Sequence, residues 1–346
     1  MNTNRQSRLR IGILSFAHGH ANSYAFELEQ RDDVVIAGIW DADPERGAEM
    51  ARRFDTIYYR SKDILLGDEL DGVIIASENV HHRSLVEAAA SAGVKAILCE
   101  KPLATTVPDA ESMIRYCSDR GVKLATSFPC RYAPSFRSMR EKVLAGEIGE
   151  ILAIRGTNRG SMPGGWFVDT SLSGGGAIMD HTVHVADLMW LLLGQEAVSV
   201  YAESGNQFHH QSWDDTGLLT LTYADGVFAT IDTSWCRPKG FPTSGDVTLQ
   251  IIGTRGVLDL DLFGQKLVHY NDASQSDCFY WGSSLDKDMI DDFLLLCEGG
   301  SAPYLATGED GLRAGAITSA AYAAVLLNDP VNVDAGVEQR VPAYSL

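Results

Sequence analysis

The stretch RLRIGILSFAHGHANSYAFELEQ, residues 8–30, has the pattern of a buried strand, a tight turn and then a helix. This order is typical of the first unit of a dinucleotide-binding fold, whose turn carries glycines that let the backbone approach a pyrophosphate. With the strand ending at Leu14, the three small-residue positions of such a turn fall on Ser15, Ala17 and His20. The N-terminus of the following helix favours an anion. The sequence therefore predicts a cofactor loop in which other residues replace the glycines.

Alternating apolar and amphipathic patterns continue through the first third of the chain. Strands are predicted over 9–16, 34–41, 71–77, 95–102 and 122–128, and helices over 22–31, 44–54, 82–93 and 107–121. Apolar strands separated by amphipathic helices indicate a parallel sheet with helices on both faces. Because crossovers between parallel strands are right-handed, the pattern predicts a doubly wound, Rossmann-type α/β domain, to which we assign residues 1–127.

The remaining residues, 128–346, have a different pattern. Strands with turn signals between them are predicted over 150–157, 197–204, 217–235, 245–262 and 265–270, and helices over 134–149, 180–194, 286–299 and 309–328. Asp-Gly within 217–235 predicts a hairpin, because this pair accepts positive φ. The succession of strands predicts a second α+β domain with a large open, mainly antiparallel sheet.

Composition excludes several classes of protein. The net charge of −18 argues against nucleic-acid and anionic-membrane partners, because phosphate binding needs clustered basic side chains. Six cysteines without a C-x-x-C pair indicate reduced thiols. The first ten residues lack an apolar signal core, and no apolar run reaches the length of a bilayer span. We therefore expect a cytoplasmic protein without a membrane or nucleic-acid partner.

Four segments resemble one known family. ASENVHHRSLVEAAASAGVKAILCEKPLA (76–104) and GGGAIMDHTVHVADLMWLLLG (174–194) are similar to two signatures of the Gfo/Idh/MocA oxidoreductases, and CRYAP (130–134) and EKVLAGEIGEILAIRG (141–156) to the connecting segment. The resemblance implies a dinucleotide-binding domain and a C-terminal domain with an open sheet. It also implies NAD(P)-dependent oxidation or reduction of a sugar or polyol, and a dimer or tetramer packed through that sheet.

The resemblance carries roles to individual residues. Lys101, in Glu-Lys-Pro, is implied to contact the substrate hydroxyl and the nicotinamide side, and Pro102 to form a constrained turn with a cis bond as one option. Asp180 and His184 stand at the catalytic positions. Our expected cofactor contacts are Ser15, Phe16, Ala17, His18, His20, Asp41, Ser77, Asn79, His82, Glu100 and Lys101. Our expected substrate contacts are Lys101, Arg131, Trp166, Asp180, His181 and His184.

The helix predicted over 180–194 supports these roles independently. Asp180, His184 and Asp187 fall on one stripe, with His181 beside it, and the rest of the helix is apolar. Buried charges are costly without partners, so the stripe requires an explanation. A histidine can remove a hydroxyl proton at neutral pH, and a lysine can stabilise the developing charge. The alternative is a structural polar network, which is the role we assign to Asp187.

Other interpretations remain open at this point. Asp41, after the second strand, is predicted to bind ribose hydroxyls, which favours NAD over NADP. A metal at His18 and His20, or at His181 and His184, is an alternative, although we expect no metal. A dehydrogenase is the favoured function. The alternatives are an enzyme that retains NAD and catalyses elimination, glycoside cleavage or epimerisation, and a sugar or dinucleotide sensor without activity.

Overall fold

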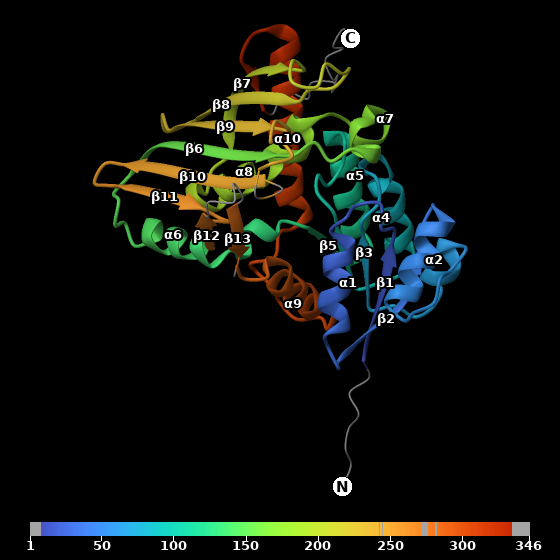
Figure 1. Ribbon diagram of the computed structural model, residues 1–346. Coiled ribbons are helices and arrows are strands. Elements are labelled where there is room, and N and C mark those ends of the chain that lie inside the picture. Colours follow the sequence, from blue (N-terminus) through green and yellow to red (C-terminus); the bar gives the residue numbers. More distant parts are fainter. Residues whose placement is uncertain (1–7, 242, 244, 271–275, 281, 334–346) are drawn as a thin grey trace. The chain divides into compact units, whose positions relative to one another are not determined.

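The computed structural model describes residues 8–241, 243, 245–270, 276–280 and 282–333 (Figure 1). The first ten residues were considered above as a signal peptide, and residues 1–7 of them lie outside the described part of the chain. Contacts divide the chain into two units, Met1–Phe128 with Asp286–Leu312, and Pro129–Leu285 with Arg313–Leu346. The segment Asp286–Leu312 is therefore grouped with the first unit, whereas the division drawn from the sequence places it in the second.

The first unit contains a parallel sheet in the order β2-β1-β3-β4-β5. Its strands are β1 (Leu9–Leu14), β2 (Val34–Trp40), β3 (Gly72–Ile75), β4 (Ala96–Cys99) and β5 (Lys123–Thr126). A parallel bridge between Ile39 and Tyr58 extends the sheet beyond β2. The predicted doubly wound fold is confirmed. Its strand order reverses between β1 and β3, and such a switch point is where open α/β sheets bind ligands at their carboxyl ends.

Helices cover both faces of this sheet (Figure 1). They are α1 (Ala21–Glu29), α2 (Pro44–Arg53), α3 (Lys62–Leu66), α4 (His82–Ser91), α5 (Val107–Ser118) and α9 (Leu285–Cys297). Only α3 was not predicted, because five residues are too few to show helical periodicity. Gly72 of β3 permits the close approach of α9, since a Cβ atom at Gly72 would lie 2.4 Å from Sγ of Cys297 and 2.9 Å from the ring of Phe293.

The second unit contains a mixed sheet in the order β11-β10-β6-β9-β8-β7-β14. Its strands are β6 (Ile151–Gly160), β7 (Ala197–Gly205), β8 (Thr216–Tyr223), β9 (Phe228–Ser234), β10 (Gly245–Gly253), β11 (Val257–Asp261) and β14 (Val331–Asn332). The mainly antiparallel sheet is confirmed, although β6 and β9 pair in parallel. The predicted hairpin between β8 and β9 is also confirmed, with Gly226 at a φ of 87°.

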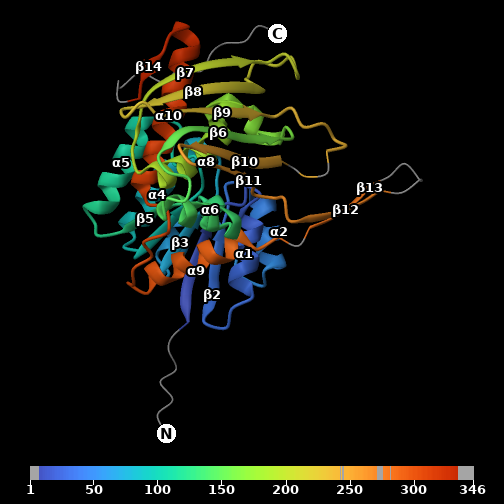
Figure 2. The same ribbon diagram turned by 90° about the vertical axis from the view of Figure 1, so that its left-hand side faces the viewer.

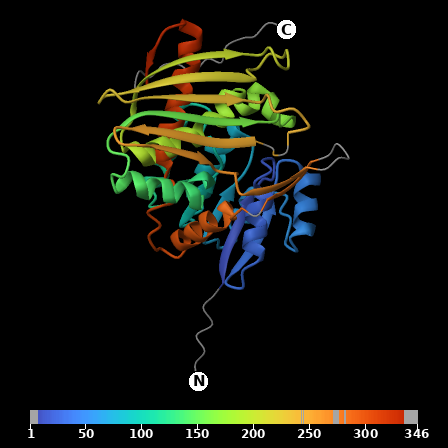
Figure 3. The same cartoon turned by 60° about the vertical axis from the view of Figure 1, so that its left-hand side comes forward.

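Helices of the second unit lie on one side of its sheet (Figures 2 and 3). They are α6 (Pro134–Leu144), α7 (Thr170–Ser173), α8 (Ala177–Leu193) and most of α10 (Gly308–Leu327). Helix α8 packs on β6, where Gly156 makes room for Val185 and Met189. A separate hairpin pairs β12 (Lys266–Tyr270) with β13 (Ser276–Tyr280).

The opposite face of this sheet carries exposed apolar side chains among polar ones. Leu218 on β8 and Phe228 on β9 are 54% and 53% exposed. Within the described part of the chain, no helix has both the length and the apolar character required to cross a membrane.

Candidate active site

The turn after β1 adopts the backbone conformation of a glycine position with a serine. Ser15 has a φ of 77°, in the left-handed region that normally favours glycine. Its hydroxyl donates to Oδ2 of Asp41 (3.2 Å) and accepts from the N–H of Ala17 (3.1 Å), which holds the turn closed. The chain therefore makes the tight turn of a dinucleotide loop at the position where the sequence places it, and this backbone fits a dinucleotide.

The amide groups of this turn, however, already have partners in the protein. The N–H of Phe16 donates to Oδ2 of Asp41 (2.7 Å), that of His18 to the carbonyl of Ala76 (2.9 Å), and that of His20 to Nδ1 of His18 (3.3 Å). In a glycine-rich loop such groups approach the phosphates. These three N–H groups are therefore not free to approach a phosphate in this conformation.

Asp41 acts as the anchor of this turn. It is 2% exposed and, besides Ser15 and Phe16, accepts from the N–H of Asp43 (2.9 Å). Arg46 donates to its two oxygens from Nε (2.8 Å) and Nη2 (2.6 Å). These hydrogen bonds hold the loop against α2, and the contact of Asp41 with the ribose hydroxyls stays a prediction.

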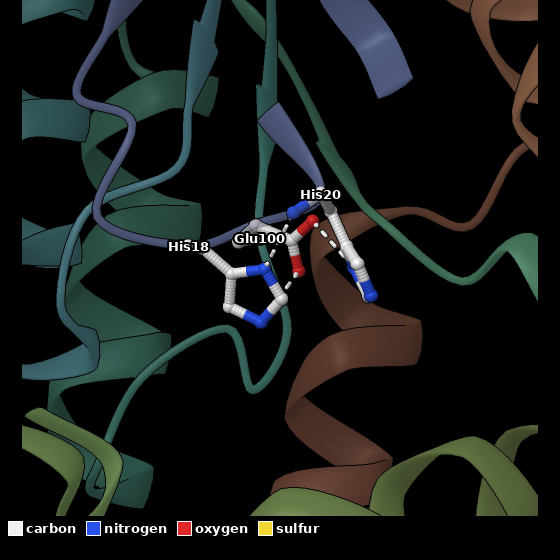
Figure 4. A group of neighbouring side chains, drawn as sticks. All are labelled: His18, His20 and Glu100. Atoms are coloured by element: carbon white, nitrogen blue, oxygen red, sulfur yellow. Dashed lines mark hydrogen bonds and ion pairs between the residues drawn. The ribbon is translucent and has the colours of Figure 1, made fainter. Parts of the chain in front are cut away.

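His18, His20 and Glu100 converge at the switch point (Figure 4). Oε1 of Glu100 lies 3.2 Å from Nδ1 of His20, and Oε2 lies 3.9 Å from Nε2 of His18. Tyr24 also donates to Oε1, and the N–H of Lys101 donates to Oε2 (3.0 Å). Glu100 is fully buried, whereas the side chain of His20 is 42% exposed. The cluster therefore connects a buried carboxylate to the surface.

Electrostatics keep this carboxylate ionised. Burial would raise the pKa of Glu100, but the charges of His18 and His20 outweigh it and lower the pKa well below its ordinary value. For His20, burial would lower the pKa, but the Glu100 carboxylate outweighs this and raises it above 6.5. His18, His20 and Glu100 also have side chains of the types that bind metals, and their potential ligand atoms all lie within 4.8 Å of one another. Among the described residues, His181 and His184 belong to no such group.

Lys101 is held by the segment around it. The Lys101–Pro102 peptide bond is cis. Lys101 comes shortly after the end of β4 and is 4% exposed. His82 is fully buried, with Nδ1 3.0 Å from the carbonyl of Pro102 and Nε2 3.3 Å from the carbonyl of Ser77. Burial lowers the pKa of His82. His82 thus connects the loop after β3, where Asn79 is buried, to the turn that carries Lys101.

In the second unit, Asp214 holds the start of α8. Its Oδ1 accepts from the N–H of Gly176 (3.0 Å) and its Oδ2 from the N–H of Ile178 (2.8 Å). Tyr322 donates to Oδ1 as well (3.0 Å). A Cβ atom at Gly176 would lie 2.1 Å from the carbonyl oxygen of Asp214, so this glycine is required for the contact. The sequence analysis does not identify Asp214, because it caps the helix through Ile178, which lies 36 residues earlier in the chain.

Asp180, in the first turn of α8, pairs with an aromatic and an imidazole side chain. Nε1 of Trp235 donates to its Oδ2 (3.2 Å), and Nε2 of His181 lies 3.2 Å from the same oxygen. One turn further along α8, Nδ1 of His184 lies 3.9 Å from Sγ of Cys130. Trp235 and Cys130 were missed as neighbours of the site, because their contacts depend on the fold of β9 and of the 3-10 turn Pro129–Tyr132.

Arg131 and Asp187 form a buried ion pair. Both are 2% exposed, and the guanidinium binds the carboxylate through Nε (2.7 Å) and Nη2. This geometry agrees with the structural role assigned to Asp187, and the contact of Arg131 with the substrate stays a prediction. Trp166 is half-buried and stacks on Phe167 with 3.9 Å between ring centroids.

Comparisons with known proteins identify the class. Residues 11–128 match the profile of the "Oxidoreductase family, NAD-binding Rossmann fold", and residues 136–259 match the "GFO/IDH/MocA C-terminal domain". The protein is therefore an oxidoreductase with an NAD(P)-binding Rossmann unit. It belongs to the Gfo/Idh/MocA family, as its sequence signatures predict.

Two curated relatives and one solved structure illustrate the similarity. The chain is 26% identical to myo-inositol 2-dehydrogenase of Thermotoga maritima, covering 88% of this chain and 93% of the relative. It is 31% identical to D-xylose 1-dehydrogenase [NADP(+)] of Haloarcula marismortui, covering 66% and 67%. The crystal structure of GenD2 from gentamicin A biosynthesis, in complex with NAD, shares the fold with a TM-score of 0.86 at 23% identity, covering 97% of this chain and 99% of GenD2.

Proposed function

We propose that this oxidoreductase is an NAD-dependent dehydrogenase that oxidises a hydroxyl group of a sugar, polyol or related compound. The observation that carries the proposal is the placement of Lys101. It follows β4 next to the switch point of a dinucleotide-binding sheet and is braced by Glu100 and His82. Relatives that act on myo-inositol and D-xylose support a polyhydroxylated substrate.

The chain's own residues divide the chemistry of alcohol oxidation. We assign His184 as the general base that accepts the hydroxyl proton, and Lys101 as the cation that stabilises the developing alkoxide. Asp180, which holds His181 and Trp235, is assigned to the orientation of the imidazole groups on α8. The turn after β1 and the helix that follows would hold the dinucleotide. When bound, the dinucleotide supplies the hydride acceptor.

A substrate panel tests this function directly. The protein is mixed with NAD and with inositols, pentoses, hexoses and their alcohols, and NADH is followed by its absorbance. We expect NADH to form with at least one of them. Product formation without net NADH would instead support the enzyme that retains NAD. Binding of a sugar without any turnover would support the sensor.

The charge at the end of β2 supports NAD over NADP. Arg46 could neutralise a 2′-phosphate, but it is paired with Asp41 and lies 3.7 Å from Glu78, so the local net charge is negative. We expect Glu78→Gln to raise NADP use relative to NAD by about two- to fivefold, the effect of one partly exposed charge pair. The ratio of kcat/KM values for the two cofactors measures this change. An unchanged ratio would contradict the inference that Glu78 helps to neutralise Arg46 and thereby disfavours NADP.

The exposed sheet face of the second unit supports a homo-oligomer. We propose that Leu218 and Phe228, each more than half exposed, pack against a second copy of the chain. A glutamate at each position, Leu218→Glu with Phe228→Glu, is expected to give monomers in light scattering coupled to size exclusion. Thr222 pairs with Phe228 across β8 and β9, so the single substitution Thr222→Glu is expected to weaken the same contact. A wild-type protein that is monomeric at micromolar concentration would refute the interface.

A cytoplasmic location is part of the proposal. Cysteines 99, 117, 130, 236 and 297 are free thiols, as is usual in a reducing compartment. Fractionation of cells that express the protein without a tag tests the location.

A further inference from the structure

In the chemistry assigned above, the cluster of His18, His20 and Glu100 has a single role, which is that Glu100 braces Lys101. A fully buried carboxylate is costly unless cations and hydrogen bonds compensate it. Glu100 receives hydrogen bonds from Tyr24 and from the N–H of Lys101, and both imidazoles face it. The arrangement therefore stabilises positive charge on His20. In the turn beside it, the N–H groups of Phe16, Ala17, His18 and His20 are already bonded within the protein.

The hydrogen bonds suit this cluster better to protons than to a metal. Nδ1 of His18 accepts the N–H of His20 (3.3 Å), so the proton of a neutral His18 ring is on Nε2, toward Glu100. A metal on that nitrogen would require the proton to move and the hydrogen bond to break. Nδ1 of His20 faces Oε1 of Glu100 at 3.2 Å and donates to it, which leaves Nε2 on the far side of the ring (Figure 4).

His20 is therefore the member of the cluster that can meet a ligand. Its side chain is 42% exposed, whereas His18 is 4% exposed and Glu100 is fully buried. We propose that His20, held as an imidazolium by Glu100, replaces the glycine-loop amides as the group that binds a phosphoryl oxygen of the dinucleotide, so that cofactor affinity depends on pH. This inference rests on the proposed function, because it concerns the cofactor of the same reaction.

The direction of the pH dependence follows from the groups that face His20. Glu100 and, from α9, Asp286 favour the charged imidazolium, whereas burial and the Lys101 ammonium oppose it, and the net result is a raised pKa. Tyr24 lies 3.5 Å from Nδ1 and His18 stacks against the ring edge. The imidazolium is present below this raised pKa and is lost as the pH rises through it. Affinity for the pyrophosphate therefore falls as the pH rises.

Equilibrium binding of ADP-ribose and NADH to the untagged full-length protein tests this inference. ADP-ribose keeps the pyrophosphate without the nicotinamide ring, and nicotinamide riboside serves as the probe without phosphate. From about pH 6 to about pH 9, which spans the titration of a histidine, we expect the Kd of ADP-ribose and NADH to rise about ten- to a hundredfold, the effect of one charged hydrogen bond. The Kd of nicotinamide riboside should not follow this change.

Four variants give the comparison its controls. His20→Gln is expected to bind weakly at every pH, with a flat profile, while the exposed His81→Gln in the same unit keeps the wild-type profile. Glu100→Gln should shift the midpoint to lower pH, because the imidazolium loses its counter-charge. Circular dichroism checks that each variant is folded. His18→Gln tests whether the ring of His18, which faces inward, is by itself responsible for the pH dependence of the Kd.

The outcomes separate this inference from the proposed function. Tight binding of NADH with a pH-independent Kd would overturn the inference and leave the dehydrogenase intact. No binding of NADH or ADP-ribose at any pH would overturn the proposed function itself. Zn²⁺ binding is the third outcome. If the wild type and His81→Gln retain one equivalent of Zn²⁺ and His20→Gln does not, the cluster is a metal site and the inference is overturned.

Discussion

Lys101→Met is expected to lower kcat by at least about 10²-fold, the low end of the effect of a positioned acid–base or electrostatic group. Methionine keeps much of the length and the apolar stem of lysine but removes the ammonium. The Kd of NADH should change much less, because the turn after β1 is held by Asp41 and Ser15. Steady-state rates, with NADH binding measured separately, distinguish the two effects.

Two further variants complete this test. His184→Asn should cause a loss of similar size, since it removes the proposed base. The control is Lys95→Met, because Lys95 is an exposed lysine paired with Asp71 and should have no catalytic effect. Near-wild-type rates for both Lys101→Met and His184→Asn would show that neither residue has its assigned role.

The largest expected effect on stability concerns the ion pair of Arg131 and Asp187. Arg131→Met leaves the Asp187 carboxylate buried without its partner, which typically costs about 3–5 kcal/mol. Replacing both residues, as in Arg131→Met with Asp187→Leu, should recover most of this loss, because neither charge then remains buried. The free energy of unfolding from urea denaturation measures both changes.

This experiment also separates the two roles considered for Arg131. A structural role predicts that the double variant, once folded, keeps the KM of the wild type. If Arg131 contacted the substrate, the double variant would be stable but its KM would rise. A single variant as stable as the wild type would contradict the buried ion pair.

Local patterns in the sequence were sufficient for most of the fold. Strands and helices of the first unit are where alternating apolar runs and amphipathic segments predict them, because each pattern reflects one buried face. The short α3 and β14 have too few residues to show such a pattern. The parallel pairing of β6 and β9 was also not predictable, since it depends on where the chain returns after α8 and two further strands.

The site was predictable where a motif fixes a position in the chain. The tight turn was placed on Ser15 because the strand before it ends at Leu14, and the resemblance to the family implied a constrained turn at Pro102. Side-chain partners within the protein were not predictable: the donors to Asp41 come from the turn after β1 and from Arg46 on α2. Likewise, Asp214 caps α8 across 36 residues of sequence, a distance at which spacing carries no information.

The return of the chain at Asp286 has a consequence for dissecting this protein. A fragment that ends at Phe128 would lack α9, which packs on Gly72 and pairs with α1 through Ser23 and Asp286. Such a fragment would expose the apolar surface of β3 to solvent and would be prone to aggregate. An autonomous cofactor-binding module would have to be assembled by grafting the α9 segment behind β5 with a new linker, and cutting the gene at a single point would not yield one.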